Sequence, residues 1–430
     1  MTTNLNREPE APGDQLETAL ESAASVDVVD PRLLVREQGV RGYWTLFQRR
    51  VRGGELGALP VVIGLILIWT IFQLQNDRFL SAQNLTNLTL QIAAVGTISV
   101  GVVLVLLLGE IDLSVGSVSG VCGAVLAVLY VKHDYSAVVA IALAVLLGAA
   151  IGLFQGFVFA WFGVPSFVVT LAGLIGWQGL QLYVLGDTGS INIPFEGGVA
   201  KLTNTFLSSA VGYVVVVVLA GLYLLTALAE RRRRSSAGLV SRSVAEIAVR
   251  AGLLAVALLA VVAVVNRDRG LPLALLIFVG VVVVFDLITR RTTFGRHIFA
   301  VGGNAEAARR AGISVTRIRV TVFMLCSALA AFGGVLAASR LLAVNQQSGG
   351  GDVLLNAIAA AVIGGTSLFG GRGSTYSALL GILVIGSISN GMDLLGLESS
   401  VKFMITGAVL LAAVILDSLS RRGRRATGRA

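Results

Sequence analysis

Twelve long apolar runs decide what this chain can fold into, because about 18 or more consecutive apolar residues can cross a bilayer as a helix. The chain of 430 residues is 55% hydrophobic and 13% charged, whereas soluble domains carry about 25% charged residues. The sequence therefore predicts an all-α protein, a polytopic transmembrane helical bundle of about twelve membrane segments. The runs cover residues 56–74, 92–109, 113–131, 137–162, 164–186, 206–229, 247–265, 271–288, 320–338, 353–370, 375–392 and 399–416.

The Lys and Arg residues test this count independently, because the cytoplasmic connections of membrane proteins are enriched in them. With a cytoplasmic N-terminus and twelve crossings, 26 of the 33 Lys and Arg residues fall on the inner side and 7 on the outer side. Both termini are therefore expected in the cytoplasm. The net charge of +9 comes from basic residues beside membrane segments, where anionic lipid attracts them. Membrane lipid is thus an expected partner, and nucleic acid is not.

The apolar runs divide the chain into three regions. Residues 1–54 are polar and are predicted to form a mobile cytoplasmic tail. Residues 55–418 form the transmembrane domain, within which 289–319 is a long cytoplasmic loop. Residues 419–430 form a basic cytoplasmic tail that suits a membrane surface.

The chain carries none of the motifs with which a protein hydrolyses ATP or holds a metal ion. Its only lysines are Lys132, Lys201 and Lys402, and none follows a glycine as in a phosphate-binding loop. Cys122 and Cys326 lie in separate apolar runs, without the spacing of a metal site or a redox pair. We therefore expect no enzyme activity, no cofactor and no metal site. If ATP drives this protein, the ATPase is another subunit.

The loop 289–319 is predicted to contain a short helix. Asn304 is a favourable N-cap, the alanines after it have high helix propensity, and Arg309 and Arg310 suit the last turn. Gly312 is placed to end the helix in a left-handed conformation. A helix this short is marginal alone in water and needs a surface to pack on. That surface is either a groove on a cytoplasmic subunit or the chain's own membrane domain, with the arginines near lipid.

Three blocks of sequence resemble bacterial ABC importer permeases for monosaccharides, the ribose, xylose and arabinose group. The blocks are GEIDLSVGS (109–117), the Gly-Gly-Asn, paired Ala and Gly-Ile pattern within 302–313, and AIAAAVIGGTSLFGGRGS (357–374). The resemblance covers the chain from about residue 85 to the C-terminus. The runs 206–229 and 247–265, with Arg-rich residues between them, look most like xylose permeases. Glu110 departs from the pattern, since this group usually has a small residue there.

The resemblance implies a multi-pass permease subunit in a bacterial plasma membrane, with the pathway between two permease copies. It also implies a separate ABC ATPase and an extracytoplasmic sugar-binding protein. The ATPase would couple to Gly302, Gly303, Asn304, Ala307, Ala308 and Gly312. Branched-chain amino acids are the main alternative substrates, because their permeases are distant relatives. The competing class is an ion-coupled secondary transporter, with Glu110, Asp112 or Asp286 binding the proton or sodium ion.

Polar residues within the apolar region are the candidates for the pathway or its gate. Asp112 lies between two closely spaced runs and Ser114 follows it at the start of the second. A carboxylate costs about 3 kcal/mol if exposed near the bilayer centre. They belong either to a broken helix beside the pathway or to a cap in which Asp112 accepts from the first amides of the next helix. Gln178, Asn356 and Asn390 would bind sugar hydroxyls or form interhelical hydrogen bonds.

The late glycine-rich stretch, 364–373, has too many glycines for a regular helix. It forms either a kinked or re-entrant element that lines a gate, or a simple turn between two helices. In both cases Arg372 marks the inner side of the membrane.

Overall fold

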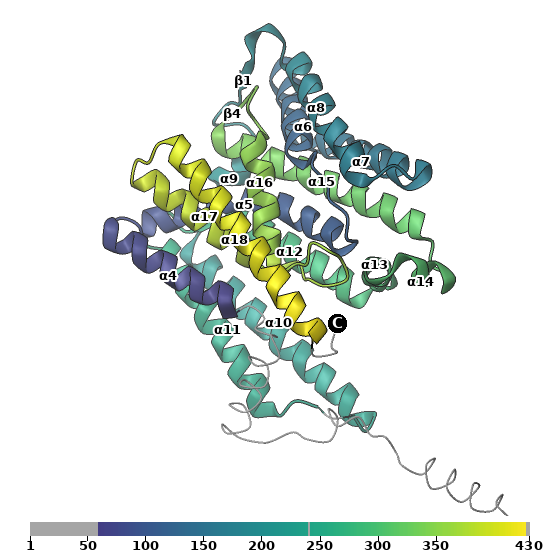
Figure 1. Ribbon diagram of the computed structural model, residues 1–430. Coiled ribbons are helices and arrows are strands. Elements are labelled where there is room, and N and C mark those ends of the chain that lie inside the picture. Colours follow the sequence, from purple (N-terminus) through teal and green to yellow (C-terminus); the bar gives the residue numbers. More distant parts are fainter. Residues whose placement is uncertain (1–58, 240, 427–430) are drawn as a thin grey trace, which may run out of the picture.

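The computed structural model describes residues 59–239 and 241–426, so the predicted tail 1–54 and residues 427–430 lie outside it. Within these ranges nine helical segments are long and apolar enough to cross a membrane, and three more are apolar but shorter (Figure 1). The nine are α5 (Ala82–Leu107), α6 with η1 (Val115–Lys132), α7 (Ala137–Phe162), α8 with η2 (Ser166–Thr188), α10 (Ser209–Ser236), α11 (Val244–Val265), α12 (Leu273–Arg291), α15 (Val315–Leu341) and α17 (Tyr376–Leu394). The shorter ones are α4 (Leu59–Gln75), α16 (Gly351–Ile363) and the apolar part, Ser399–Ala412, of α18 (Ser399–Ala426).

Each predicted apolar run coincides with one of these helices, but three boundaries differ in an informative way. Helix α5 begins at Ala82, ten residues before the predicted run, because Ser81 caps it and its polar first turns find partners on other helices. Helix α16 ends at Ile363, seven residues before the end of its run. Its 13 residues make a helix of roughly 20 Å, shorter than the ~30 Å hydrocarbon core. Helix α18 continues through residues 419–426 of the predicted basic tail.

The long loop 289–319 holds two short helices rather than one. The sequence predicts α14 (Ala305–Arg310) but not α13 (Thr293–Gly303), which precedes it. Thr292 caps α13 by accepting from the Gly295 amide at 3.1 Å, and Ile298 and Val301 are buried against the bundle. The loop is therefore folded onto the membrane domain along most of its length.

Helix α5 lies at the centre of the bundle. Of its most apolar stretch, 89% of the residues are buried inside the protein. Helices α15, α17, α12 and α16 pack around it. A helix that is apolar on every side must be covered on every side, and here neighbouring helices rather than lipid provide the cover.

Helices α7 and α15 pack with their backbones in contact. Gly148, Gly152 and Gly156 recur every fourth residue of α7 and face α15. A side-chain carbon on Gly148 would lie 2.7 Å from the carbonyl oxygen of Ser327, and one on Gly156 would lie 2.9 Å from the Cα atom of Val320. Small residues at this spacing let helices approach closely in lipid, where packing replaces the hydrophobic drive. The glycines of this helix are thus structural, as the sequence suggests.

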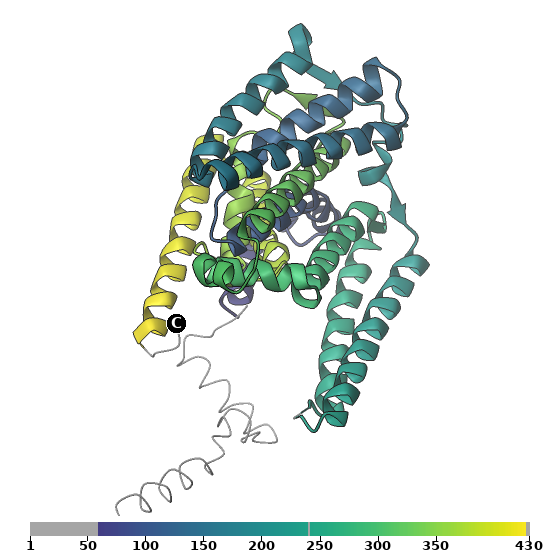
Figure 2. The same cartoon turned by 90° about the vertical axis from the view of Figure 1, so that its right-hand side faces the viewer.

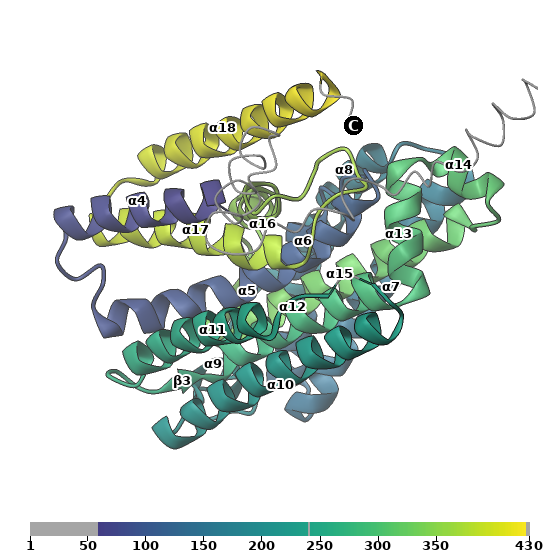
Figure 3. The same ribbon diagram turned by 90° about the horizontal axis from the view of Figure 1, so that it is seen from below.

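Helices α10 and α11 form a peripheral hairpin. Figure 2 shows them side by side and set apart from the rest of the bundle, and only 11% of the most apolar stretch of each is buried. They share a small apolar cluster of their own, which includes Val216 and Val262. On the opposite side, α4 and α18 lie with α17 (Figure 3). Phe72 of α4 packs directly on Gly391 of α17.

Two short antiparallel pairings join connections that are far apart in the sequence. Strand β1 (Ser190–Asn192) pairs with β4 (Ala343–Asn345), with Ile191 opposite Val344. Strand β2 (Phe206–Leu207) pairs with β3 (Leu271–Pro272). Between them runs the short helix α9 (Lys201–Asn204). These pairings fix the connections that the charge distribution predicts on the outer side of the membrane.

Candidate coupling surface and polar sites

Helix α14 has the caps that its sequence predicts. The Asn304 side chain accepts a hydrogen bond from the Ala307 amide at 2.9 Å. Gly312 has φ = 83°, a left-handed conformation that favours glycine. Glu306 in the first turn forms ion pairs with Arg309 and Arg310 in the last turn, at 3.0 and 3.3 Å. Local chemistry therefore sets both ends of this helix.

The six predicted coupling residues do not share one face. Gly303, Asn304, Ala307 and Gly312 are exposed, and a side-chain carbon on Gly303 would meet nothing within 4 Å. Ala308 is only 5% exposed and belongs to the main apolar core. The inward face of α14, which carries Ala308, therefore packs on the chain's own helices, and Ala307 lies on its exposed face.

Gly302 is also an internal contact, and it brings the three signature blocks together. A side-chain carbon at Gly302 would overlap the carbonyl oxygen of Leu107 and lie 2.8 Å from the nitrogen of Gly371. The Gly371 amide donates to the same Leu107 oxygen at 2.9 Å. The end of α5, the end of α13 and the glycine-rich loop thus meet backbone to backbone, and Gly109 lies against Phe369 in the same junction.

The glycine-rich stretch forms an irregular loop between α16 and α17 rather than a helix. After α16 ends at Ile363, Gly365, Gly370 and Gly371 all have positive φ. Ser367 donates its amide to the Arg372 carbonyl at 3.0 Å, which closes the loop on itself. Of the two predicted alternatives, a re-entrant element or a turn between two helices, this geometry matches the turn.

Asp112 caps the start of α6, the second of its two predicted roles. Its Oδ1 accepts the Ser114 amide at 2.8 Å, and the Ser114 hydroxyl lies 2.6 Å from the same oxygen. That hydroxyl is also 3.1 Å from Oε1 of Gln155 on α7. Asp112 is 3% exposed and its Oδ2 has no hydrogen-bond partner in the described structure. Burial raises the pKa of this carboxyl, and the bonds from Ser114 partly oppose that rise.

The other three pathway candidates lie on three different helices. Gln178 is exposed on α8, and Asn356 is half-buried on α16. Asn390 is buried on α17, where its Oδ1 accepts from the Asn84 side chain at 2.7 Å and its amide donates to Gln91 at 3.3 Å. Asn390 thus makes interhelical hydrogen bonds, and no hydrogen bond joins these three residues to one another within the described part of the chain.

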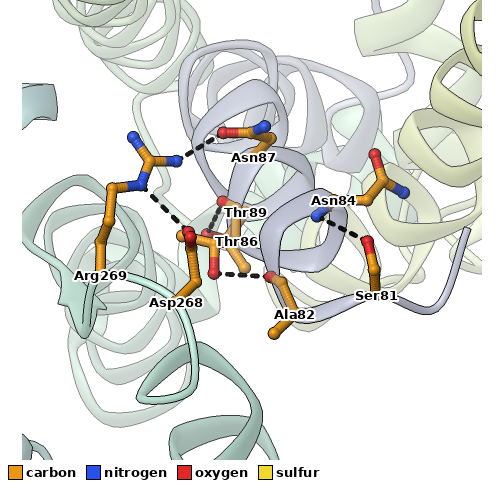
Figure 4. Close-up of polar contacts among 8 residues, drawn as sticks. All are labelled: Ser81, Ala82, Asn84, Thr86, Asn87, Thr89, Asp268 and Arg269. Carbon is orange, nitrogen blue, oxygen red and sulfur yellow. Dashed lines mark hydrogen bonds and ion pairs between the residues drawn. The ribbon is translucent and has the colours of Figure 1, made fainter. Parts of the chain in front are cut away.

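A polar cluster that was not predicted from the sequence lies around the first turns of α5 (Figure 4). Arg269, between α11 and α12, donates to Asn87 at 2.6 Å and pairs with Asp268 at 3.0 Å. Its guanidinium also lies 4.5 Å from the centre of the Phe206 ring. The spacing of Asn84, Asn87 and Gln91, which places them on one helical face, is the signal that could have revealed the cluster.

Glu110, in the short connection between α5 and α6, is held by two elements. Its Oε1 lies 2.9 Å from a guanidinium nitrogen of Arg319 on α15, and its Oε2 accepts the Ser166 hydroxyl at 2.8 Å. The pair borders a cavity of about 500 Å³, lined also by Gly163 and by Arg309 of α14. Connections that the charge count places on one side of the membrane therefore meet around one cavity.

Known proteins similar to this chain are membrane permeases. Residues 84–414 match the family described as branched-chain amino acid transport system, permease component. The chain is 34% identical to the xylose transport system permease protein of Escherichia coli K12, over 85% of this chain and 91% of that protein. It is 30% identical to an L-arabinose ABC transporter permease of Azospirillum brasilense, over 88% and 93% of the two chains. The ribose import permease of Escherichia coli K12 is 30% identical, over 83% and 92%. No solved structure matches the chain.

Proposed function

Since the chain belongs to the permease-component family of branched-chain amino acid transport systems, a family of multi-pass ABC permease subunits, we propose that it forms the membrane pathway of an ATP-driven importer for a monosaccharide. The observation that carries the proposal is α14. It is a capped helix with an exposed face, and it directly follows α13, whose Gly302 packs on the end of the central helix α5. A partner that moves α14 would act directly on the core of the bundle.

Xylose is the proposed substrate. Permeases for three pentoses match most of the chain, and the xylose permease is the more similar of those compared above. The peripheral α10–α11 hairpin, which the sequence likens to xylose permeases, supports the same choice. Branched-chain amino acids remain the alternative cargo because the family description names them.

Twelve crossings with both termini in the cytoplasm are the proposed topology. The charge count supports it, and so does the cavity at which Glu110, Gly163 and Arg309 meet, since all three belong to connections predicted inside. Helix α16 is too short to cross alone, so the glycine-rich loop would complete its passage. The ABC ATPase would then dock on the exposed face of α14, and the sugar-binding protein on the outer connections.

A second copy of the chain is the proposed partner within the membrane. Gln178 is exposed on a helix whose neighbouring exposed residues are apolar, such as Ile175 and Leu182. An amide facing lipid is unfavourable, whereas one facing a pathway between two copies would meet water or sugar. The pathway for the sugar would then form between the two protomers.

Reconstitution in liposomes with the cognate ATPase and binding protein tests the proposal. We expect the binding protein loaded with D-xylose to stimulate both ATP hydrolysis and uptake, and the same protein loaded with leucine to stimulate neither. Gly303→Arg should abolish the stimulation, because the side chain would project into the docking face, while Gly303→Ala should not. An importer for this sugar is ruled out if the D-xylose-loaded protein has no effect on the wild-type complex.

Ion-coupled transport makes the opposite prediction. Uptake would then persist without the ATPase and would collapse with an ionophore. The three acidic residues that such a mechanism could use are engaged: Glu110 with Arg319, Asp286 with Arg290 at 2.8 Å, and Asp112 in its cap. This arrangement favours the ATP-driven alternative.

A further inference from the structure

Arg319 lies near the start of α15, shortly after α14, which is the proposed coupling helix. Helix α14 ends at Arg310 and α15 begins at Val315, so only four residues separate them. That link is held by hydrogen bonds, since the Ile313 amide donates to the Ala308 carbonyl at 3.0 Å. Ala308 and Val315 are both buried on either side of the link. A displacement of α14 therefore reaches the first turns of α15, which carry Arg319.

From α15, Arg319 reaches the connection between α5 and α6 and also helix α7. It contacts Glu110 in the short connection between α5 and α6 at 2.9 Å. Its guanidinium also lies 4.9 Å from the centre of the Phe159 ring near the end of α7. Both charged side chains are mostly covered, with 26% of Arg319 and 15% of Glu110 exposed. A charged pair with this much cover is less screened than a surface pair.

Glu110 also contacts the first residue of α8. Its second oxygen accepts the hydroxyl of Ser166, the first residue of α8. The adjoining backbone makes a further contact with the same helix, because the Thr170 hydroxyl lies 3.5 Å from the Ile111 carbonyl. The Glu110 carboxylate therefore links Arg319, in the first turns of α15, to the start of α8, the helix that carries the exposed Gln178.

The surroundings of the pair leave room for movement. The cavity of about 500 Å³ lies beside Glu110 and Arg319, so these side chains are not packed on every side. The Nε atom of Arg319 is buried and has no hydrogen-bond partner in the described part of the chain. One guanidinium nitrogen of Arg319 is bonded to Glu110, its Nε atom is not bonded, and open space lies beside the pair. The pair can therefore change its geometry without displacing a packed core.

We propose that Glu110 and Arg319 are positioning residues that transmit the movement of the coupling helix to the start of α8 and so to the pathway. The proposal rests on the function proposed above. The two residues bind neither sugar nor ATP; they fix how far α8 follows α14 during the transport cycle.

The test is a charge exchange in the reconstituted complex of permease, ATPase and binding protein. Glu110→Gln and Arg319→Gln should each reduce the stimulation of ATP hydrolysis by sugar-loaded binding protein at least tenfold. The double exchange, Glu110→Arg with Arg319→Glu, should recover more than half of it, because the pair is restored in reverse. Arg317→Gln is the matched control, since Arg317 is exposed two residues away on the same helix.

Thermal unfolding of each purified variant separates transmission from simple stability. Transmission requires a large loss of stimulation in single variants that unfold near the wild-type temperature. Single variants that keep wild-type stimulation overturn the inference, and so does a double exchange that folds but stays uncoupled. A wild-type complex without stimulation refutes the proposed function itself, so the two failures are distinguishable.

Discussion

Two adjacent glycines at the end of α13 offer a sharp test of the junction between the three signature blocks. Gly302→Ala adds a methyl group that overlaps the Leu107 carbonyl oxygen and lies 2.8 Å from the Gly371 nitrogen. These are backbone atoms, which cannot turn aside as a side chain can. Gly303→Ala, one residue later, adds the same methyl group to open space.

The two substitutions should differ strongly in their effect on the free energy of unfolding. Overpacking of a close contact costs about 1–3 kcal/mol, and losing the bond from the Gly371 amide to Leu107 adds about 1 kcal/mol. Gly302→Ala should therefore destabilise the protein by roughly 2–4 kcal/mol. Gly303→Ala should be neutral or up to about 1 kcal/mol stabilising, because alanine is the better helix former.

Thermal unfolding in detergent micelles, followed by intrinsic fluorescence, measures the difference. The apparent midpoint of Gly302→Ala should fall several degrees below that of the wild type, and that of Gly303→Ala should not fall. If Gly302→Ala unfolds at the wild-type temperature or above it, α13 does not approach α5 as closely as the structure shows. The order of the midpoints is informative even if unfolding is irreversible.

Three further substitutions address the coupling helix, the outer cluster and the buried carboxyl. Ala307→Glu should lower uptake without lowering the unfolding temperature, because Ala307 is exposed on α14; a loss of stability instead would place it in the core. Arg269→Ala should expose the α10–α11 hairpin to protease by removing the bond to Asn87, whereas unchanged digestion would mean that this contact does not hold the hairpin. Asp112→Asn should keep the cap on Ser114 and keep uptake; complete loss of uptake in a folded variant would favour ion coupling. Burial raises the pKa of Asp112. The stability that this group contributes in the wild type is therefore fully present below the ordinary pKa of 3.8 and is lost as the pH rises through the raised value. Thermal unfolding of Asp112→Asn at several pH values should lack this dependence.

Sequence reasoning succeeded where the determining interactions are local. The apolar runs predict helices because each run carries its own signal over about 18 residues. The caps of α14 were predictable for the same reason, since Asn304 and Gly312 act within a few residues of themselves. The capping role of Asp112 was predictable as one of two readings, and the geometry at Ser114 matches it.

Long-range contacts explain what sequence reasoning missed. The first turns of α5 look too polar for a membrane helix until Asn390 and Arg269 are brought to them from distant segments. The sequence cannot distinguish Ala307 from Ala308, because only the position of α14 on the bundle decides which one is buried. The partner of Glu110, Arg319, is likewise 209 residues away.

The glycine stripe between α7 and α15 also limits how the protein can move. Helices whose backbones touch at three successive turns cannot slide lengthwise, because each turn would then have to climb over a ridge of the other helix. We therefore expect the two helices to move together as one rigid strut. If the pathway alternates between two open states, the strut must rotate as a whole, and the change in shape must come from the elements hinged against it.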